Sequence, residues 1–379
     1  MCEYLLMWKD MPVFSFDTEA KFGHVVAPKL LPYGMKNPGV CYGDLVSFAS
    51  GRVLQTNRKY FKEIVTSCGI DDQSDLNIFI ASKGLSFRDN YWVKKADSLE
   101  KWEDVNLYNN AFSSEISYTA LTGETCSVSI GDALFTGELT GKGTRAKCFV
   151  REGSGIYLVK AETDREIASE VVSQFVATAL GLPATKYAAT KYAGLNTSVC
   201  QIGTSSEKEL IPCADILRYF GGEMSADSKY YEFFMQKAPV NFLKMQIFDY
   251  VTLNTDRNRD NFALLRENGV IKGLFPIYDH DSCFKGKSTS ALYFVTKKSF
   301  SDSLEFLKER YGGEFSLIEK DVRNLHDYLC GKGKEIFDSY GLSDCVNGAI
   351  SRTEDILIST KEKVWEEPDE KPGKSPEDD

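Results

Sequence analysis

The feature that most constrains the fold is the polar stretch "NTDRNRDNFALL", Asn254–Leu265. It follows an apolar helical pattern over residues 240–254 and precedes two apolar strand patterns within residues 261–279. The two strand patterns flank Asn268-Gly269, a dipeptide that strongly indicates a tight hairpin. A helix followed by a hairpin therefore holds the polar stretch at both of its ends, and this predicts a rigidly placed loop.

The hairpin also predicts which side chains meet. Its second strand returns toward the start of its first, which brings Asp279 close to Asn261 on the same loop as Asp256. Carboxylate and amide oxygens suit Mg²⁺, which takes few protein ligands and completes its shell with phosphate oxygens. In protein kinases a catalytic Asp is followed five residues later by a metal-binding Asn, and a metal-binding Asp follows a hairpin. The alternative is that these residues only satisfy backbone groups of a turn.

A glycine-rich stretch upstream favours a phosphate-binding loop. "TGKGTRAK" holds Gly141 and Gly143, with Ala146 in the third small position. It does not fit the Walker A pattern, and a strand pattern rather than a helix follows it, which argues against a dinucleotide fingerprint. A flap that covers phosphates fits this order of elements better, and a flexible surface loop is the alternative.

A lysine stands at the end of the next apolar strand pattern, "GIYLVKAE". Lys160 in such a strand requires a partner, and kinases use a lysine there to hold the ATP phosphates and pair it with a glutamate on the next helix. The helical pattern "DREIASEVVSQFVATALGL" offers Glu166 and Glu170. The alternatives are a lysine that extends to water and glutamates on a solvated helix face.

The remaining patterns predict an α+β organisation. In the N-terminal part we expect a helix over residues 58–70 and strands over residues 77–87 and 90–95. Helical patterns dominate after residue 300. The tail "EEPDEKPGKSPEDD" is acidic, rich in proline and lacks apolar residues, so we expect disorder there. The expected regions are an N-terminal α+β region (1–130), a small lobe (131–205), a helical large lobe with the polar loop (206–366) and the tail (367–379).

Composition excludes several classes of function. The net charge of −10 argues against direct nucleic acid binding and against binding to an anionic membrane. Ten cysteines are scattered without any CxxC spacing and only three histidines are present, so no zinc site is predicted. We expect reduced cysteines, no signal peptide, no membrane span and a cytoplasmic location.

Taken together, these segments resemble the HipA-like kinases, a bacterial serine/threonine kinase family. The matching pieces lie between residues 133 and 360 and keep the family's order: "LTGKGTRAKCFV", "GIYLVKAE", "ASEVVSQFVATALGL", "LNTDRNRDNFALL" and "LFPIYDHDSC". The resemblance implies a divergent bilobal protein-kinase-like (HipA-like) fold, α+β in class, with an N-terminal α+β region. It also implies ATP and Mg²⁺ as cofactors.

The resemblance implies roles for individual residues. Asp256 would be the catalytic base, and Asn261 and Asp279 would hold Mg²⁺. Lys160 would contact the ATP phosphates and Glu170 would pair with it.

The resemblance also places the rest of the nucleotide. The loop Gly141–Lys147 would cover the phosphates, with Gly141, Gly143, Thr144 and Lys147 as its cofactor-binding residues. The backbone near Cys200 and Gln201 would meet the adenine. Thr144 is the nearest candidate for the autophosphorylation that is frequent in the family.

The chain departs from the family pattern at three positions. Asn258 stands where many members have His, and His280 and Asp281 follow Asp279 where small or amide residues are usual. Asp281 is either an extra metal ligand or a turn residue.

The sequence therefore predicts a protein kinase that phosphorylates Ser or Thr. One alternative is a nucleotide-sensing pseudokinase that acts as a binding module, and another is a phosphotransferase for small molecules. The protein substrate is not predictable. Some family members pair with a small DNA-binding antitoxin, so an antitoxin-like protein partner is an open expectation.

Overall fold

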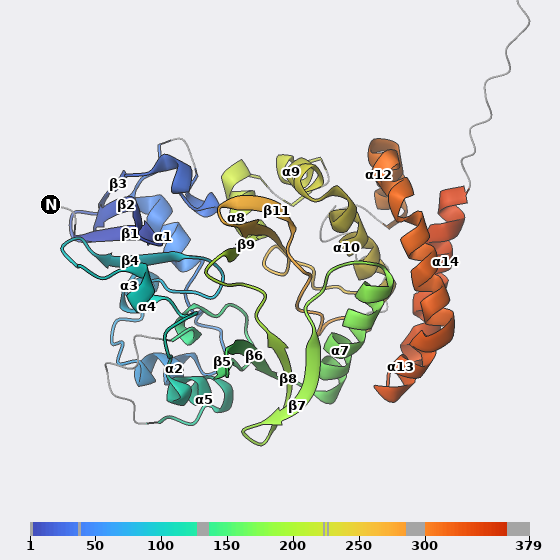
Figure 1. Ribbon diagram of the computed structural model, residues 1–379, viewed down its shortest axis with the longest axis horizontal. Helices are drawn as coiled ribbons and strands as arrows, with labels where there is room; N and C mark the ends of the chain where they lie inside the picture. The colour runs from blue at the N-terminus through green and yellow to red at the C-terminus, as the bar shows by residue number, and fades with distance from the viewer. Residues whose placement is uncertain are drawn as a thin grey trace, which may run out of the picture.

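The computed structural model is organised as an N-terminal sheet, two further sheets and a set of C-terminal helices, in that order across the molecule (Figure 1). The predicted boundary at residues 130/131 and the predicted tail at 367–379 lie outside the described residues. The structure describes residues 3–36, 39–126, 136–222, 224–225, 227–285 and 300–361.

The N-terminal region is a four-stranded antiparallel sheet with helices packed on it. The strands run in the order β3-β2-β1-β4, and they bury Leu6, Phe14 and Phe16 against the helices. The strands are β1 (Tyr4–Trp8), β2 (Met11–Asp17), β3 (Phe22–Val25) and β4 (Tyr91–Lys95). The helices are α1 (Tyr42–Ser50), α2 (Phe61–Ser67), α3 (Asp75–Ala81), α4 (Trp102–Val105) and α5 (Ser114–Thr122), with short 3₁₀ turns at Pro28–Leu30 and Tyr33–Met35.

One secondary-structure prediction in this region is wrong. The expected strand over residues 77–87 is instead the helix α3 and the turn that follows it. A short run of consecutive apolar residues carries no periodicity that separates a strand from a buried helix. Packing decided the outcome, because Phe79 lies edge-on to Phe48 of α1 with ring centroids 6.1 Å apart.

The small lobe is an antiparallel sheet in the order β5-β6-β8-β7 with helix α7 packed against it. The register places Lys147 of β5 directly opposite Lys160 of β6. A capping box between Thr163 and Glu166 starts α7. The elements are β5 (Lys147–Glu152), β6 (Gly155–Ala161), α7 (Asp164–Ala179), β7 (Tyr187–Tyr192) and β8 (Leu195–Gln201), after a 3₁₀ turn at Glu138–Thr140.

The large lobe combines the sheet β11-β10-β9 with helices. Asn268 and Gly269 both have positive φ, 48° and 81°, the turn conformation that the predicted hairpin requires. The strands are β9 (Lys208–Pro212), β10 (Ala263–Glu267) and β11 (Val270–Leu274). The helices are α8 (Cys213–Phe220), α9 (Lys229–Lys237), α10 (Pro239–Thr252), α12 (Phe300–Tyr328), α13 (Lys334–Ser339) and α14 (Ser343–Lys361), with a short π-helix at Leu329–Gly333.

The N-terminal region contacts both lobes. On the large lobe, Glu209 of β9 accepts hydrogen bonds from the Trp8 indole at 3.0 Å and from the Asn90 amide at 3.1 Å. On the small lobe, the Lys59 amide donates to the carbonyl of Thr144 at 2.8 Å. The region therefore bridges the two lobes. Among the helices of the described residues, none has the length and apolar character that a membrane crossing requires.

Candidate active site

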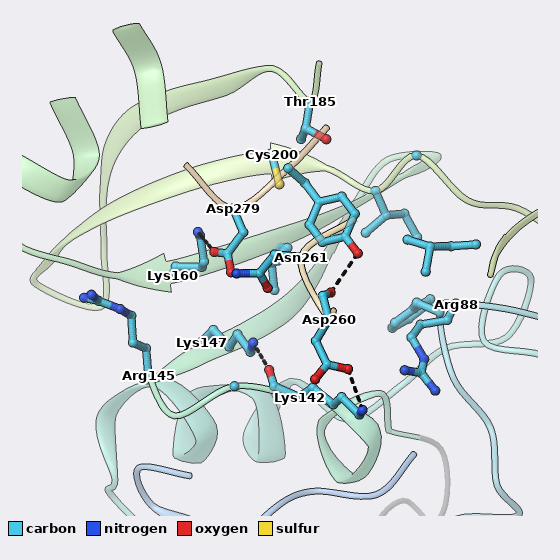
Figure 2. A pocket seen from close by; sticks show the side chains of 18 of the residues that line it. Arg88, Lys142, Arg145, Lys147, Lys160, Thr185, Cys200, Asp260, Asn261 and Asp279 are labelled. Carbon is cyan, nitrogen blue, oxygen red and sulfur yellow. Dashed lines mark hydrogen bonds and ion pairs between the residues drawn. The ribbon is translucent and has the colours of Figure 1, made fainter. Parts of the chain in front are cut away.

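A cavity of about 580 Å³ lies where the two lobes and the N-terminal region meet (Figure 2). Its size is in the range of small-molecule sites. All of the predicted site residues except Glu170 line it. These are Gly141, Gly143, Thr144, Lys147, Lys160, Gln201, Asp256, Asn261 and Asp279.

The polar loop after α10 is organised by a buried arginine. The Arg257 guanidinium is fully buried and forms an ion pair with Asp249 of α10, with 3.0 Å between Nη2 and Oδ1. Its Nη1 also donates to the carbonyl of Asn261 at 2.6 Å and to that of Tyr278 at 2.9 Å. One side chain thus joins the polar loop, the helix before it and the strand end that carries Asp279.

Sequence reasoning missed Arg257 and Asp249, although a signal was present. Asp249 is a charged residue inside a helix that is otherwise buried, and such a residue requires a partner. Arg257 is the nearest following arginine.

Asp256 is held by its own loop. The side-chain Nδ2 of Asn261 donates to the Asp256 backbone carbonyl at 2.8 Å and to Asp256 Oδ2 at 3.1 Å. Asn258 Nδ2 donates to Asp256 Oδ1 at 3.0 Å. Desolvation raises the pKa of Asp256, the hydrogen bond from Asn258 opposes this rise, and the charges of Asp279 and Asp281 add to it. Asp256 is therefore a better proton acceptor than an ordinary aspartate.

Asn261 and Asp279 present oxygens to the cavity. The side-chain Nδ2 of Asn261 donates to Asp256, so its side-chain oxygen Oδ1 remains available to bind a cation. Asp279 has a φ of 62°, a left-handed conformation that is uncommon outside glycine. Burial alone would raise the pKa of Asp279, but the charges of Lys160 and Lys147 lower it to about 2. Asp279 is thus a carboxylate at neutral pH.

The structure pairs Lys160 with Glu170 and not with Glu166. Lys160 Nζ donates to Glu170 Oε1, and it lies 3.2 Å from both Asp279 Oδ1 and Glu162 Oε1. Burial alone would lower the pKa of Lys160, but the three carboxylates, Glu170 foremost, raise it well above the usual value. The ammonium is charged, and three carboxylates hold its position.

Glu170 is fully buried behind the cavity, so it is neither solvated nor on its wall. Its second oxygen accepts the backbone amide of His280 at 2.8 Å. It therefore connects α7 and Lys160 with the residue after Asp279. Glu166 caps α7 and forms ion pairs with Arg145 at 2.6 Å and Lys285 at 2.9 Å.

Lys147 adds a second lysine to the same cavity wall. Its ammonium donates to the carbonyl of Lys142. Burial lowers the pKa of Lys147 to about 7, with Arg58 adding to the fall and Asp279 opposing it. Two lysines opposite each other on neighbouring strands repel, so an anion between Lys147 and Lys160 would be strongly favoured.

Ion pairs tie the glycine-rich loop to the polar loop and to the segment that follows Asp279. Lys142 Nζ lies 2.8 Å from Asp260 Oδ1, and Arg145 Nε lies 2.8 Å from Asp281 Oδ2. Gly143 has a φ of 97°, and a Cβ there would lie 2.9 Å from the Lys147 ammonium. The loop thus requires glycine for its conformation, and the absence of a side chain leaves room for the Lys147 ammonium.

The end of β8 forms the apolar side of the cavity. Gln201 and Gly203 line it together with Leu158 and Phe275. A Cβ on Gly203 would lie 2.8 Å from the Phe275 ring, so this wall is closely packed. A flat aromatic base would fit against these residues.

The buried ring of His280 packs behind the cavity. It lies 5.2 Å from the ring of Phe248, and its Nδ1 is 3.4 Å from Arg257 Nη2. Burial and the neighbouring charge of Arg257 lower the pKa of His280 well below its usual range, so the ring is neutral.

Comparison with solved structures places this arrangement in a known fold. HipA from Shewanella oneidensis MR-1, in its complex with HipB and operator DNA, matches with a TM-score of 0.62 and 12% identity, covering 94% of this chain and 97% of that one. The Helicobacter pylori proinflammatory kinase CtkA gives 0.40 and 16%, over 58% of this chain and 92% of that one. Aminoglycoside phosphotransferase APH(4)-Ia gives 0.22 and 11%, over 59% and 94%. No protein-family model and no curated protein sequence matches the chain.

The HipA match extends over nearly the whole of both chains. The chain therefore has an α+β, bilobal, kinase-like fold of the HipA type with an N-terminal sheet region, as the sequence predicted.

Proposed function

We propose that the protein is an ATP- and Mg²⁺-dependent kinase that transfers the γ-phosphoryl group to a Ser or Thr hydroxyl of a protein. One observation carries this proposal. A single cavity presents Asp256, Asn261, Asp279 and a Lys160 that is held by the buried Glu170. This is the set of groups that phosphoryl transfer requires for positioning and charge stabilisation.

The lysines would hold the nucleotide. Lys160, fixed by Glu170, and Lys147 would bind phosphate oxygens between them, and the backbone of the loop around Gly141 and Gly143 would cover them. The Lys142–Asp260 ion pair would hold this cover against the polar loop and exclude water. Adenine would lie against Gln201.

The oxygens of Asn261 and Asp279 fit Mg²⁺. No group of three or more His, Cys, Asp and Glu side chains within the described ranges could hold a metal ion by itself. Mg²⁺ is commonly held by one or two protein oxygens, and phosphate oxygens and water complete its coordination shell. Bound there, Mg²⁺ would supply positive charge to the phosphates during transfer.

Asp256 would act on the acceptor hydroxyl. Its raised pKa favours it as a base, and its hydrogen bonds from Asn258 and Asn261 fix its direction. It would orient the hydroxyl in line with the γ-phosphoryl group and accept its proton as the new bond forms.

Thr144 is proposed as an autophosphorylation site, because it lines the cavity on the glycine-rich loop. HipA from Shewanella is seen with HipB, and we propose a comparable antitoxin-like partner here. We also propose a cytoplasmic location, because all nine cysteines in the described part of the chain are free thiols, as in a reducing compartment.

The test is incubation of the purified protein with Mg²⁺ and γ-labelled ATP, followed by mass spectrometry of the label. Wild type is compared with Asp256→Ala and with Asp97→Ala, a matched control at an exposed turn after β4. The proposal expects label on a Ser or Thr in wild type and the control, and none in Asp256→Ala. No label together with a nucleotide-induced rise in melting temperature would indicate a nucleotide-sensing module instead. If neither label nor a rise in melting temperature is observed, the proposal is rejected.

A further inference from the structure

The N-terminal region contributes one wall of the cavity. Ser86, Phe87 and Arg88, between α3 and β4, line it. The Arg88 carbonyl accepts the Leu210 amide of β9 at 2.7 Å, and the Phe87 carbonyl accepts the hydroxyl of Thr204. The segment is therefore fixed beside the chain that leaves β8, at the apolar end of the cavity.

Arg88 is exceptional among the cations of this cavity. Its guanidinium has no hydrogen bond or ion pair with any of the described residues, and its Nε is buried. A buried N–H group without a partner is costly, and few are found in folded proteins. The other cations that line the cavity each have a protein partner: Lys142, Arg145, Lys147 and Lys160.

The charge of Arg88 acts inside the cavity. Burial lowers the pKa of Lys142, and the charge of Arg88 is the next largest cause. Arg88 also opposes the rise in the pKa of Tyr278, whose hydroxyl donates to the carbonyl of Asp260 at 2.9 Å. The charge of Arg88 thus acts on two residues that line the same cavity.

The position of Arg88 separates it from the lysines that face Asp279. Figure 2 shows Arg88 on one side of Asp260 and Lys142, with Lys147 and Lys160 on the other. A nucleotide whose phosphates lie at these two lysines would present its nucleoside part, not its phosphates, to Arg88.

We infer that Arg88 binds the nucleoside part of the nucleotide, donating hydrogen bonds to ribose or base acceptors from the N-terminal region. The inference rests on the proposed nucleotide-dependent function and adds a third wall to the nucleotide site. A guanidinium suits this position, because its planar fork donates to two acceptors and also stacks on a flat ring. The N-terminal region is then a part of the site and not only a support for the small lobe.

The test is calorimetric titration of the full chain with ADP, adenosine and inorganic tripolyphosphate. Wild type is compared with Arg88→Gln, with Arg88→Lys, and with Arg151→Gln as a matched control. Arg151 also contacts the N-terminal region, donating to the carbonyl of Leu107 at 2.8 Å, but does not line the cavity. Arg88→Lys keeps the charge and removes the fork, and circular dichroism verifies that each variant is folded.

The inference expects Arg88→Gln to weaken ADP and adenosine by a similar factor, about tenfold, as for loss of a charged donor. Tripolyphosphate binding stays unchanged, Arg88→Lys gives a smaller loss, and Arg151→Gln binds as wild type. Equal ADP binding by wild type and Arg88→Gln would overturn the inference while leaving the nucleotide site standing. A loss for tripolyphosphate as large as for ADP would assign Arg88 to the phosphates and also overturn it. If wild type binds none of the three, the proposed function itself fails.

Discussion

The two loops that enclose the cavity are held in opposite ways. The polar loop that carries Asp256 is fixed by the Arg257–Asp249 pair, whose side chains are 0% and 1% exposed. The glycine-rich loop is fixed by the Lys142–Asp260 pair, whose side chains are 22% and 34% exposed. Buried pairs are costly to break, whereas pairs that water reaches contribute less, down to about 0–1 kcal/mol at the surface.

The buried pair and the partly exposed pair suit two different tasks in the site. The groups proposed for chemistry require positions fixed to a fraction of an ångström, and a buried network supplies this. The groups proposed to cover the nucleotide have to release the product, and weak pairs permit this.

Breaking the buried pair should have the largest effect. Arg257→Met leaves Asp249 as an uncompensated buried charge, so the free energy of unfolding should fall by about 3–5 kcal/mol. Phosphoryl transfer should be lost in the same variant, because the carbonyls of Asn261 and Tyr278 lose their shared donor. Urea unfolding measures the first effect and the labelled-ATP assay the second.

The double variant Arg257→Met with Asp249→Leu serves as its control. It should recover most of the stability without recovering transfer, because the buried charge is gone but the shared donor is still missing. A loss below about 1 kcal/mol in the single variant would contradict a rigid polar loop.

Loosening Lys160 should reduce transfer while leaving the fold intact. Glu170→Gln keeps the shape of the side chain and removes the charge that fixes the ammonium, so kcat should fall about 100-fold through misplacement. Steady-state kinetics with a mapped substrate measures this change. Asp164→Asn, at an exposed position on the same helix where Asn196 donates to its carboxylate at 2.8 Å, is the matched control, and an equal loss in both variants would rule out a specific role for Glu170.

The pH dependence of nucleotide binding should report Lys147. Its pKa of about 7 in the free protein means that the ammonium loses its proton as the pH rises above 7. Because phosphate binding requires the charged form, ADP affinity should fall by up to about tenfold per pH unit from pH 7 toward 9, with proton uptake on binding. Calorimetry in two buffers of different ionisation enthalpy measures the uptake.

The Lys147→Met variant is the comparison for that experiment. It should bind ADP weakly and with little dependence on pH over the same range. A slope that persists in the variant would assign the titration to another group.

Opening the glycine-rich loop should have the smallest effect on stability. Lys142→Gln removes a partly exposed pair, so the free energy of unfolding should change by about 1 kcal/mol or less. The KM for ATP should rise, because the cover is no longer tied to Asp260. Lys208→Gln, which removes a pair with Glu267 outside the cavity lining, is the control and should leave KM unchanged. A large loss of stability in Lys142→Gln would show that the two loops are equally rigid.

Local sequence was sufficient where local chemistry decides the structure. The Asn268-Gly269 turn and the apolar alternation around it fixed the hairpin, and the hairpin then placed Asp279 beside the polar loop. The capping-box spacing from Thr163 to Glu166 also accounts for Glu166. That signal was available to separate it from Glu170.

Contacts between distant segments were beyond local patterns. Asp249 inside a buried helix signals a partner such as Arg257, but no local pattern indicates that Arg257 also binds the carbonyls of Asn261 and Tyr278. Arg88 enters the cavity from a region that showed no site motif, because its position depends on packing against β9. Residues 77–87 form a helix and turn because of their tertiary neighbours, which their short apolar run does not reveal.

The attachment of the N-terminal region to both lobes has a consequence for scattering measurements. The N-terminal region bonds to Glu209 of the large lobe, and Arg151 of β5 in the small lobe donates to the carbonyls of Leu107 and Asn110, so these contacts oppose rotation of one lobe against the other. Solution small-angle X-ray scattering should then give the same radius of gyration with and without nucleotide. Closure would be confined to the glycine-rich loop, a displacement too local to change the scattering envelope.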